Sequence, residues 1–309
     1  MNSPARTVAT LASAPDDAAV SHAAIERAKQ ALAAFSTREV EIVGLAPGVA
    51  ADLFFDLAPD ATREGATRAL RDALGAEPID AIVQPTAFRR KKLLIADMDS
   101  TMIGQECIDE LADMAGLRLQ VAAITERAMR GEIAFEPALR ERVGLLRGLE
   151  DSVVAKVIAE RITLTPGGAE LVATMRANGA HTALISGGFT LFTRRIAEAL
   201  GFHEHRANAL LVEDGRFSGF VGEPILGRQA KLAALLELRE LRGLRKEETL
   251  AVGDGANDLA MLEEAGLGIA YHAKPAVAAA AHARIEHADL TALLYAQGYR
   301  RNEFTSSSI

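Results

Sequence analysis

The chain has 309 residues, a formal net charge of −8, 49% hydrophobic residues and 25% charged residues. This composition is ordinary for a globular protein with room for two domains. The negative charge argues against a nucleic-acid surface, because binding a phosphate backbone needs clustered Lys and Arg. The only cysteine, Cys107, excludes an internal disulfide and favours a reducing, cytoplasmic location. No apolar run is long enough for a membrane span, and the first twenty residues lack the apolar core of a signal peptide.

Residues 1–88 are predicted to form an N-terminal α/β domain. The stretches "TVATLA", "VEIVGLA", "ADLFFDL" and "IDAIVQP" read as strands, and "DAAVSHAAIERAKQALAAF" and "TREGATRALRDALG" as helices. The resulting order, βαββαβ, is the ferredoxin-like pattern. We find no reactive group of residues in this domain, so its charged residues are interpreted as solvated faces.

The rest of the chain predicts a doubly wound α/β core with a helical insertion. Strands that alternate with helices over 89–103 and 166–298 indicate a parallel sheet. Residues 104–165 have helical periodicity throughout and are predicted to form a cap over one edge of that sheet. The polar end, 299–309, is expected to be a flexible tail.

Two short segments of the core allow more specific predictions. Asp214 and Gly215 lie in the middle of "ALLVEDGRFSGFV", which predicts a β-hairpin. His203 and His205 could suggest a metal site, but with no further ligand nearby we expect a surface turn.

Three predicted strands end in polar residues. They are "LLIADMDST", "TALISGGF" and "LAVGDGAND", and a fourth polar group, Lys231, begins a helix. Ligands of parallel sheets bind at the carboxyl ends of the strands, so these turns are expected to meet in one crevice. Taken singly, each has an ordinary structural explanation: Ser186 as a helix N-cap, the glycines as turn residues and Lys231 as a solvated lysine.

The carboxylates of this crevice predict a metal site. Asp97 and Asp99 point to the same side of an extended segment, and "GDGAND" adds Asp254 and Asp258. Several carboxylates in one crevice need a cation, and oxygen ligands without His or Cys favour Mg²⁺, which commonly pairs with a substrate phosphate.

The same residues can perform phosphoryl transfer. One aspartate can attack phosphorus to give an aspartyl-phosphate, and a second can protonate the leaving oxygen and later deprotonate water. The Ser186 hydroxyl, the Gly187 amide and the Lys231 ammonium can stabilise the phosphoryl oxygens.

In this order, "DMDST", "SGG", a lysine and "GDGAND" resemble the four motifs of the haloacid dehalogenase superfamily of phosphatases, over residues 92–290. "GQECIDELADMAG" and "AMRGEIAFEPALRERVGLL" bring the chain closer to the phosphoserine phosphatase family, which hydrolyses O-phosphoserine in the last step of serine biosynthesis. The resemblance implies a Rossmann-like core, a helical cap and an ACT-like N-terminal domain. Met98 departs from the family, where many members have Phe, but it should face away from the aspartates.

The resemblance implies a role for each site residue. Asp97 would be the nucleophile and a Mg²⁺ ligand, Asp99 the general acid and base and a ligand through its main-chain carbonyl, and Asp254 the third ligand. Ser186, Gly187 and Lys231 would bind the phosphoryl group, and Asn257 and Asp258 would support the metal and phosphate site. Glu106 would bind the substrate's ammonium and Arg142 its carboxylate. Met129 and Phe135 would close over the substrate.

Other interpretations stay open. Without the resemblance, Glu106 and Arg142 are solvated helix charges, and Met129 and Phe135 pack within the cap. The chemistry also suits another small phosphomonoester or transfer of the phosphoryl group to an alcohol. A protein of another class would sense an amino acid through the N-terminal domain. The expected partner is a small-molecule substrate, with no nucleic acid or membrane, and a homodimer is left open.

Overall fold

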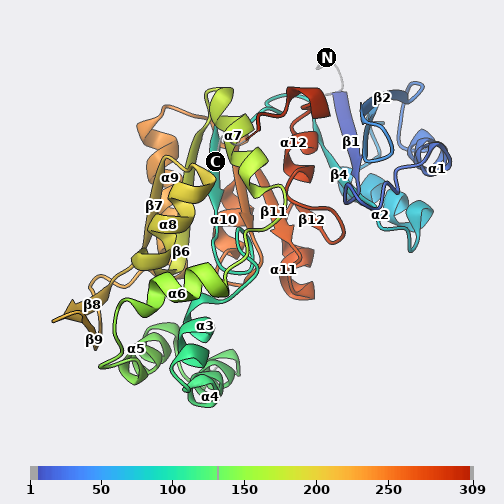
Figure 1. Cartoon of the computed structure of the whole chain (residues 1–309). Helices are drawn as coiled ribbons and strands as arrows, with labels where there is room; N and C mark the ends of the chain where they lie inside the picture. The colour runs from blue at the N-terminus through green and yellow to red at the C-terminus, as the bar shows by residue number, and fades with distance from the viewer. Residues whose placement is uncertain (1–5, 131, 307–309) are drawn as a thin grey trace.

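The computed structural model describes residues 6–130 and 132–306, and Figure 1 shows an N-terminal domain, an α/β core and a helical cap. The N-terminal domain has the predicted order βαββαβ, and its antiparallel sheet has the strand order β2-β3-β1-β4. Its elements are β1 (Arg6–Ala12), α1 (His22–Ala33), β2 (Glu41–Ala46), β3 (Ala50–Asp56), α2 (Arg63–Leu74) and β4 (Asp80–Pro85).

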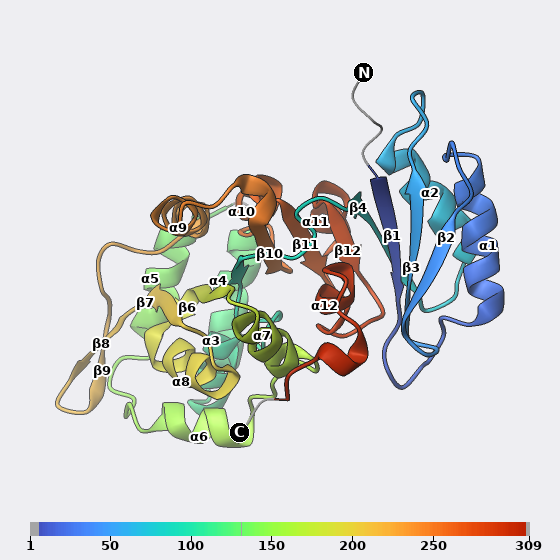
Figure 2. The ribbon, with the colours of Figure 1, turned by 90° about the horizontal axis from the view of Figure 1, so that it is seen from above.

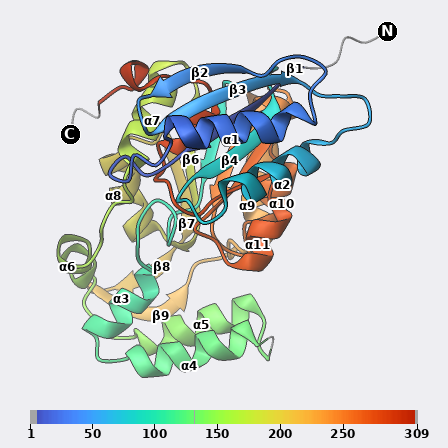
Figure 3. The ribbon, with the colours of Figure 1, turned by 90° about the vertical axis from the view of Figure 1, so that its right-hand side faces the viewer.

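Helices α1 and α2 cover the outer face of the N-terminal sheet (Figure 3). Each begins where the sequence provides a cap: the Ser21 hydroxyl accepts from the Ala24 amide, and the Thr62 hydroxyl accepts from the Gly65 amide. Each then buries one apolar stripe, Ala24, Ala28 and Leu32 in α1 and Ala66, Leu70 and Leu74 in α2. The ACT-like prediction is confirmed by this arrangement.

The core sheet of the described residues is parallel and has the strand order β12-β11-β10-β5-β6-β7. Its strands are β5 (Leu93–Ala96), β6 (His181–Phe189), β7 (Glu204–Asn208), β10 (Thr249–Gly253), β11 (Leu267–Tyr271) and β12 (Ala283–Ile285). The helices beside it are α7 (Gly168–Ala177), α8 (Thr190–Leu200), α9 (Arg228–Leu241), α10 (Leu259–Glu264), α11 (Pro275–Ala280) and α12 (Ala292–Ala296). Because β10, β5 and β6 are neighbours, the three strands with polar ends lie side by side, and the doubly wound prediction is confirmed.

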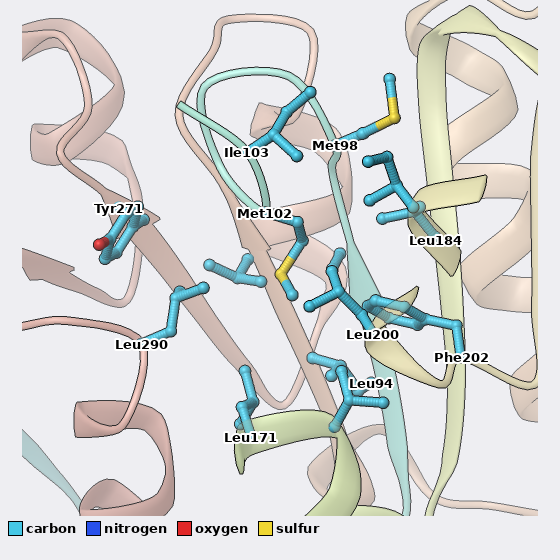
Figure 4. Packing of buried hydrophobic residues seen from close by; sticks show 14 of the residues in the cluster. Leu94, Met98, Met102, Ile103, Leu171, Leu184, Leu200, Phe202, Tyr271 and Leu290 are labelled. Atoms are coloured by element: carbon cyan, nitrogen blue, oxygen red, sulfur yellow. The ribbon is translucent and has the colours of Figure 1, made fainter. Parts of the chain in front are cut away.

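Apolar packing fixes both faces of this sheet. Leu94 and Leu184 point to one face, where they join Met98, Leu171 and Leu200 (Figure 4). Leu93, Ile95 and Ile185 point to the other face, against Leu235 of α9 and Met261 of α10. The first cluster places the Met98 side chain in the core, away from the crevice, as expected.

The cap lies at the carboxyl ends of the core strands and consists of α3 (Cys107–Met114), α4 (Arg118–Met129), α5 (Phe135–Leu145) and α6 (Val153–Glu160) (Figures 1 and 3). The predicted hairpin is formed by β8 (Leu210–Glu213) and β9 (Arg216–Val221). Its turn residues Asp214 and Gly215 have φ angles of 50° and 72°, the left-handed values that a two-residue hairpin turn requires.

The inner face of the N-terminal sheet packs on the core at α12 and the end of β12 (Figure 2). Arg89 and Asp52 form a buried ion pair here, with nitrogen–oxygen distances of 2.6 and 2.7 Å. Arg89 also donates to the carbonyl oxygens of Tyr295 and Ala296 at 2.9 and 2.7 Å. The Asp80 carboxylate accepts from the consecutive amides of Glu286, His287 and Ala288 at 2.8 to 3.0 Å. The two sheets are therefore joined by satisfied buried polar groups as well as apolar contact.

Two expectations were wrong. The surface turn expected for His203 and His205 is found only at His203, which is exposed at a bend. His205 lies instead in strand β7 at the edge of the sheet, where the Thr193 hydroxyl contacts its Nδ1 at 2.9 Å. The described part of the 299–309 tail is ordered: Tyr299 is buried, Arg90 pairs with Glu303, and a short 3₁₀ helix spans Arg301–Glu303. Residues 307–309 of that tail lie outside the described residues.

Candidate active site

The ends of β5, β6 and β10 meet the cap at a cavity of about 310 Å³. Strand β5 delivers Asp97 and Asp99, and β6 and β10 deliver Ser186 and Asp254. Residues predicted from the sequence make up much of the lining: Asp97, Asp99, Glu106, Phe135, Arg142, Ser186, Gly187, Asp254 and Asn257. The structure thus brings together groups that lie up to 160 residues apart in the chain.

Lys231 and Asp258 form the floor of the site beside Asp97. The Lys231 ammonium lies 2.7 Å from Asp97 Oδ2 and 2.6 Å from Asp258 Oδ1, and all three residues are buried. Burial alone would lower the pKa of Lys231, but the two carboxylates outweigh it and hold that pKa above its ordinary value. Lys231 is therefore a permanent positive charge next to the carboxylate predicted to attack phosphorus.

Asp99 has the environment of a proton carrier. Its Oδ1 accepts from the Cys107 amide at 3.0 Å, and its Oδ2 lies 3.4 Å from the Ser186 hydroxyl. Burial and the charge of Asp97 raise the pKa of Asp99 to about 6. A carboxyl with a pKa near neutrality can both donate and accept a proton at physiological pH.

The carboxylates suit a hard divalent cation. Oxygen atoms of Asp97, Asp254 and Asp258 lie within 4.8 Å of one another, whereas the Asp99 carboxylate stands outside this group in the described part of the chain. Burial and the charge of Asp97 raise the pKa of Asp254 to about 6, and the Thr101 hydroxyl donates to its Oδ1 at 3.0 Å. A bound cation would relieve the repulsion that raises this pKa, so the donor set fits a divalent metal.

The last part of β6 holds the predicted phosphate donors close to Asp99. The Gly188 amide donates to Ser186 Oγ at 2.9 Å. A Cβ atom at Gly188 would lie 2.8 Å from Asp99 Oδ2 and 3.1 Å from Ser186 Oγ, so a side chain at this position would have to displace Asp99. Gly188 was not singled out from the sequence, although the doubled glycine of "SGG" was a signal for a close approach.

The cap residues line the opposite wall. Glu106, the N-cap of α3, accepts from the Ser100 hydroxyl at 2.7 Å, and its partial withdrawal from solvent together with the charge of Asp99 raises its pKa. Burial lowers the pKa of Arg142, whose Nε lies 3.3 Å from the Ala138 carbonyl oxygen in α5. Phe135 reaches from the cap toward Gly187. The side chain of Met129, the last residue of α4, lies outside the described part of the structure.

Comparison with known proteins agrees with this geometry. The haloacid dehalogenase-like hydrolase family matches residues 94–263. A phosphoserine phosphatase of Albidiferax ferrireducens is 45% identical over 70% of this chain and 93% of its own length. A phosphoserine phosphatase of Archaeoglobus fulgidus is 43% identical over 70% of this chain, which spans 63% of that relative.

A solved HAD family hydrolase from Salmonella enterica superimposes with a TM-score of 0.82 at 29% identity, over 94% of this chain and 98% of that one. This structure extends the likeness across the N-terminal domain. Among the described residues, none of the helices has the length and apolar character needed to cross a membrane. The chain belongs to the haloacid dehalogenase-like hydrolase family, and the two relatives named above are phosphoserine phosphatases.

Proposed function

We propose that this chain is a phosphoserine phosphatase that hydrolyses O-phosphoserine to serine and phosphate. The observation that carries the proposal is a single cavity in which Asp97, Asp99 and Ser186 face the charged cap residues Glu106 and Arg142. The first three suit phosphoryl transfer, and the last two suit the ammonium and carboxylate of an amino acid.

In the first step, a carboxylate oxygen of Asp97 attacks phosphorus and the bond from phosphorus to the serine oxygen breaks. Asp99, with a pKa of about 6, gives its proton to the departing serine oxygen. The Ser186 hydroxyl, the Gly187 amide and the Lys231 ammonium bind the phosphoryl oxygens and stabilise their charge. The products are free serine and an aspartyl-phosphate on Asp97.

In the second step, Asp99 takes a proton from a water molecule, whose oxygen attacks the aspartyl-phosphate. The bond between phosphorus and the Asp97 oxygen breaks, so inorganic phosphate leaves and both aspartates return to their starting state. Because Lys231 pairs with Asp258 as well as with Asp97, Asp258 holds its ammonium in place while Asp97 carries the phosphoryl group.

The proposed cofactor is Mg²⁺, held by Asp97, by the Asp99 main-chain carbonyl and by Asp254, with Asp258 and Asn257 in support. Its all-oxygen donor set and the carboxylate group described above support this choice over zinc. When bound, Mg²⁺ neutralises charge on the phosphoryl group.

Specificity is assigned to the cap. The Arg142 guanidinium can bind the substrate carboxylate through two hydrogen bonds, and Glu106 can accept from the ammonium. Phe135 and Met129 would close the cavity over the bound substrate. In the structure, Phe135 already faces Gly187 across the cavity, which supports its part in closure.

The decisive experiment measures phosphate release from L-phosphoserine with and without Mg²⁺, for the wild type and Asp97→Asn. The proposal expects Mg²⁺-dependent release by the wild type and none above background for the variant. A variant that works at the wild-type rate would reject the aspartyl-phosphate mechanism. A panel of other phosphomonoesters tests the substrate, which is wrong if phosphoserine is not preferred.

A further inference from the structure

Asn208, the last residue of β7, is buried between two segments that belong to the phosphate site. Its Nδ2 donates to the Gly187 carbonyl oxygen at 2.8 Å and to the Leu226 carbonyl oxygen at 3.2 Å. Its Oδ1 accepts from the Leu226 amide at 2.7 Å. These bonds fix the orientation of the side-chain amide, because the flipped form would face two N–H groups toward each other at Leu226.

The first segment is the last part of β6, which Asn208 holds by the carbonyl group of Gly187. Gly187 O belongs to the same planar peptide as Gly188 N–H, and the two point in opposite directions across a trans bond. With the carbonyl held by Asn208, the N–H is directed to Ser186 Oγ, which it reaches at 2.9 Å. Ser186 Oγ therefore has its acceptor side occupied, and its own proton points to Asp99 Oδ2 at 3.4 Å.

The second segment leads into the helix of the catalytic lysine. Leu226 is followed by Gly227, the N-cap of α9, and Lys231 lies in the first turns of that helix. Asn208 bonds both the amide and the carbonyl of Leu226, so it sets the position of this segment relative to the last part of β6. One buried amide thus ties together the chain segments that carry two of the proposed phosphoryl-binding groups.

We infer that Asn208 is a positioning residue for phosphate binding, acting through the Gly187–Gly188 peptide on the Ser186 hydroxyl. The inference rests on the proposed function in one respect, the role of Ser186 as a phosphoryl ligand. Asn208 itself does not line the cavity. In the free protein the Ser186 hydroxyl is directed to Asp99. When phosphate binds, this hydroxyl would rotate toward a phosphoryl oxygen while Asn208 keeps its hydrogen bonds.

A double-mutant cycle tests this chain of contacts. Asn208→Asp keeps the shape of the side chain and the oxygen that accepts from the Leu226 amide. Its second carboxylate oxygen replaces the donor and therefore faces the carbonyl oxygens of Gly187 and Leu226. Ser186→Ala removes the hydroxyl. The Kd of inorganic phosphate, measured by calorimetry in the presence of Mg²⁺, should rise about tenfold in each single variant, the loss of roughly one strong hydrogen bond. If Asn208 acts through Ser186, the double variant should bind within about twofold of Ser186→Ala alone.

Gln84 offers a matched control, since it is a buried amide that donates to the Ala296 carbonyl oxygen at 2.7 Å, at the junction with the N-terminal domain. Gln84→Glu makes the same chemical change as Asn208→Asp and should lower the melting temperature while leaving the phosphate Kd unchanged. Should Asn208→Asp not fold, Asn208→Ser removes the same two donor bonds without a charge and completes the cycle.

Two results would overturn the inference: wild-type phosphate affinity in the Asn208 variants, or losses that multiply to about a hundredfold in the double variant, as independent sites require. The KM for para-nitrophenyl phosphate should follow the same cycle. Neither probe needs phosphoserine to be the substrate, so a wild type that ignores phosphoserine would reject the proposed substrate and leave the cycle interpretable.

Discussion

Replacing Gly188 with alanine should displace the Asp99 carboxylate, because the structure leaves no room for a methyl group. The new Cβ would lie 2.8 Å from Asp99 Oδ2, about 0.6 Å short of ordinary contact at 3.4 Å. Asp99 has little freedom to retreat, since its Oδ1 is bound to the Cys107 amide at 3.0 Å. A shift of this size in a group that transfers a proton should lower the rate about 10- to 100-fold, given that a misplacement of roughly 1 Å costs about 100-fold.

The assay compares kcat/KM for phosphoserine with kcat/KM for para-nitrophenyl phosphate. The value of kcat/KM reports the steps up to and including departure of the leaving group. A serine oxygen needs a proton when it departs, whereas para-nitrophenolate leaves without one. Gly188→Ala should therefore lower kcat/KM 10- to 100-fold for phosphoserine and only a few-fold for the aryl phosphate, because only the serine oxygen depends on the proton from Asp99.

Gly144→Ala is the matched control, because a Cβ atom at this position of α5 would meet nothing within 4 Å. It should leave both kcat/KM values unchanged and, as a glycine-to-alanine change inside a helix, stabilise the fold by about 0.5–1 kcal/mol. Equal losses on the two substrates in Gly188→Ala would refute the assignment of Asp99 as the acid. An unchanged kcat/KM for phosphoserine would refute the steric reasoning itself.

Three further predictions concern charged side chains that are buried or partly buried. Arg142→Ala should raise the KM for phosphoserine at least tenfold, the loss of a charge-assisted pair, and change the KM for para-nitrophenyl phosphate only a few-fold; equal changes would contradict the specificity assignment. Arg89→Ala leaves the buried Asp52 carboxylate without its cationic partner, and among the described residues only the Thr10 hydroxyl still bonds it. The free energy of unfolding in urea should fall by about 3–5 kcal/mol, and adding the neutral Asp52→Asn to Arg89→Ala should reduce this loss. Losses that simply add in the double variant would contradict the prediction. Burial lowers the pKa of Lys91 to about 8, below the unfolded value of about 10.4. Between these two pH values the folded chain therefore binds fewer protons than the unfolded chain. The free energy of unfolding should then rise by about 2.5 kcal/mol from pH 8 to 10.5 relative to Lys91→Met, and a flat difference would contradict this.

Hydrophobic periodicity was sufficient to predict the elements around the site. Strand β5 is a run of four buried apolar residues followed at once by Asp97, and the rule for carboxyl ends of parallel strands placed Ser186 and Asp254 beside it. The hairpin turn at Asp214 and Gly215 was predictable for a similar reason, since few residues adopt left-handed backbone angles. These features depend on local sequence and on one general topological rule.

The edge of the sheet was not predictable in the same way. Strand β7, Glu204–Asn208, is polar at every position except Ala207. His205 and Arg206 are partly buried, and the position of the strand is set by pairing with β6 and by side-chain partners from other elements. The ordered end of the chain likewise depends on Arg90, about 210 residues earlier, which contacts Tyr299 and pairs with Glu303. Such contacts lie between distant residues, and no pattern within a short window reveals them.

The same limit applies to Asn208 and Gly188 in the site. A single asparagine after a weak strand pattern carries no signal of its own, and its partners Gly187 and Leu226 are 21 and 18 residues away. Gly188 stands in a recognised motif, but only the position of the Asp99 carboxylate shows why a side chain is excluded. The sequence thus predicted the groups that we propose to react, whereas the groups that we propose to position them emerged from the fold.

The placement of the N-terminal domain limits how it can influence the site. It docks at α12 and β12, and β12 is three strands from β5 in the sheet, roughly 14 Å at the usual strand spacing. Its Asp80 accepts from backbone amides of the core, and its Asp52 pairs with Arg89, and none of these residues lines the cavity. The cap, by contrast, supplies Phe135 and Arg142 directly. A change confined to the docking surface should therefore alter stability before activity, whereas changes in α5 should alter substrate choice at constant stability.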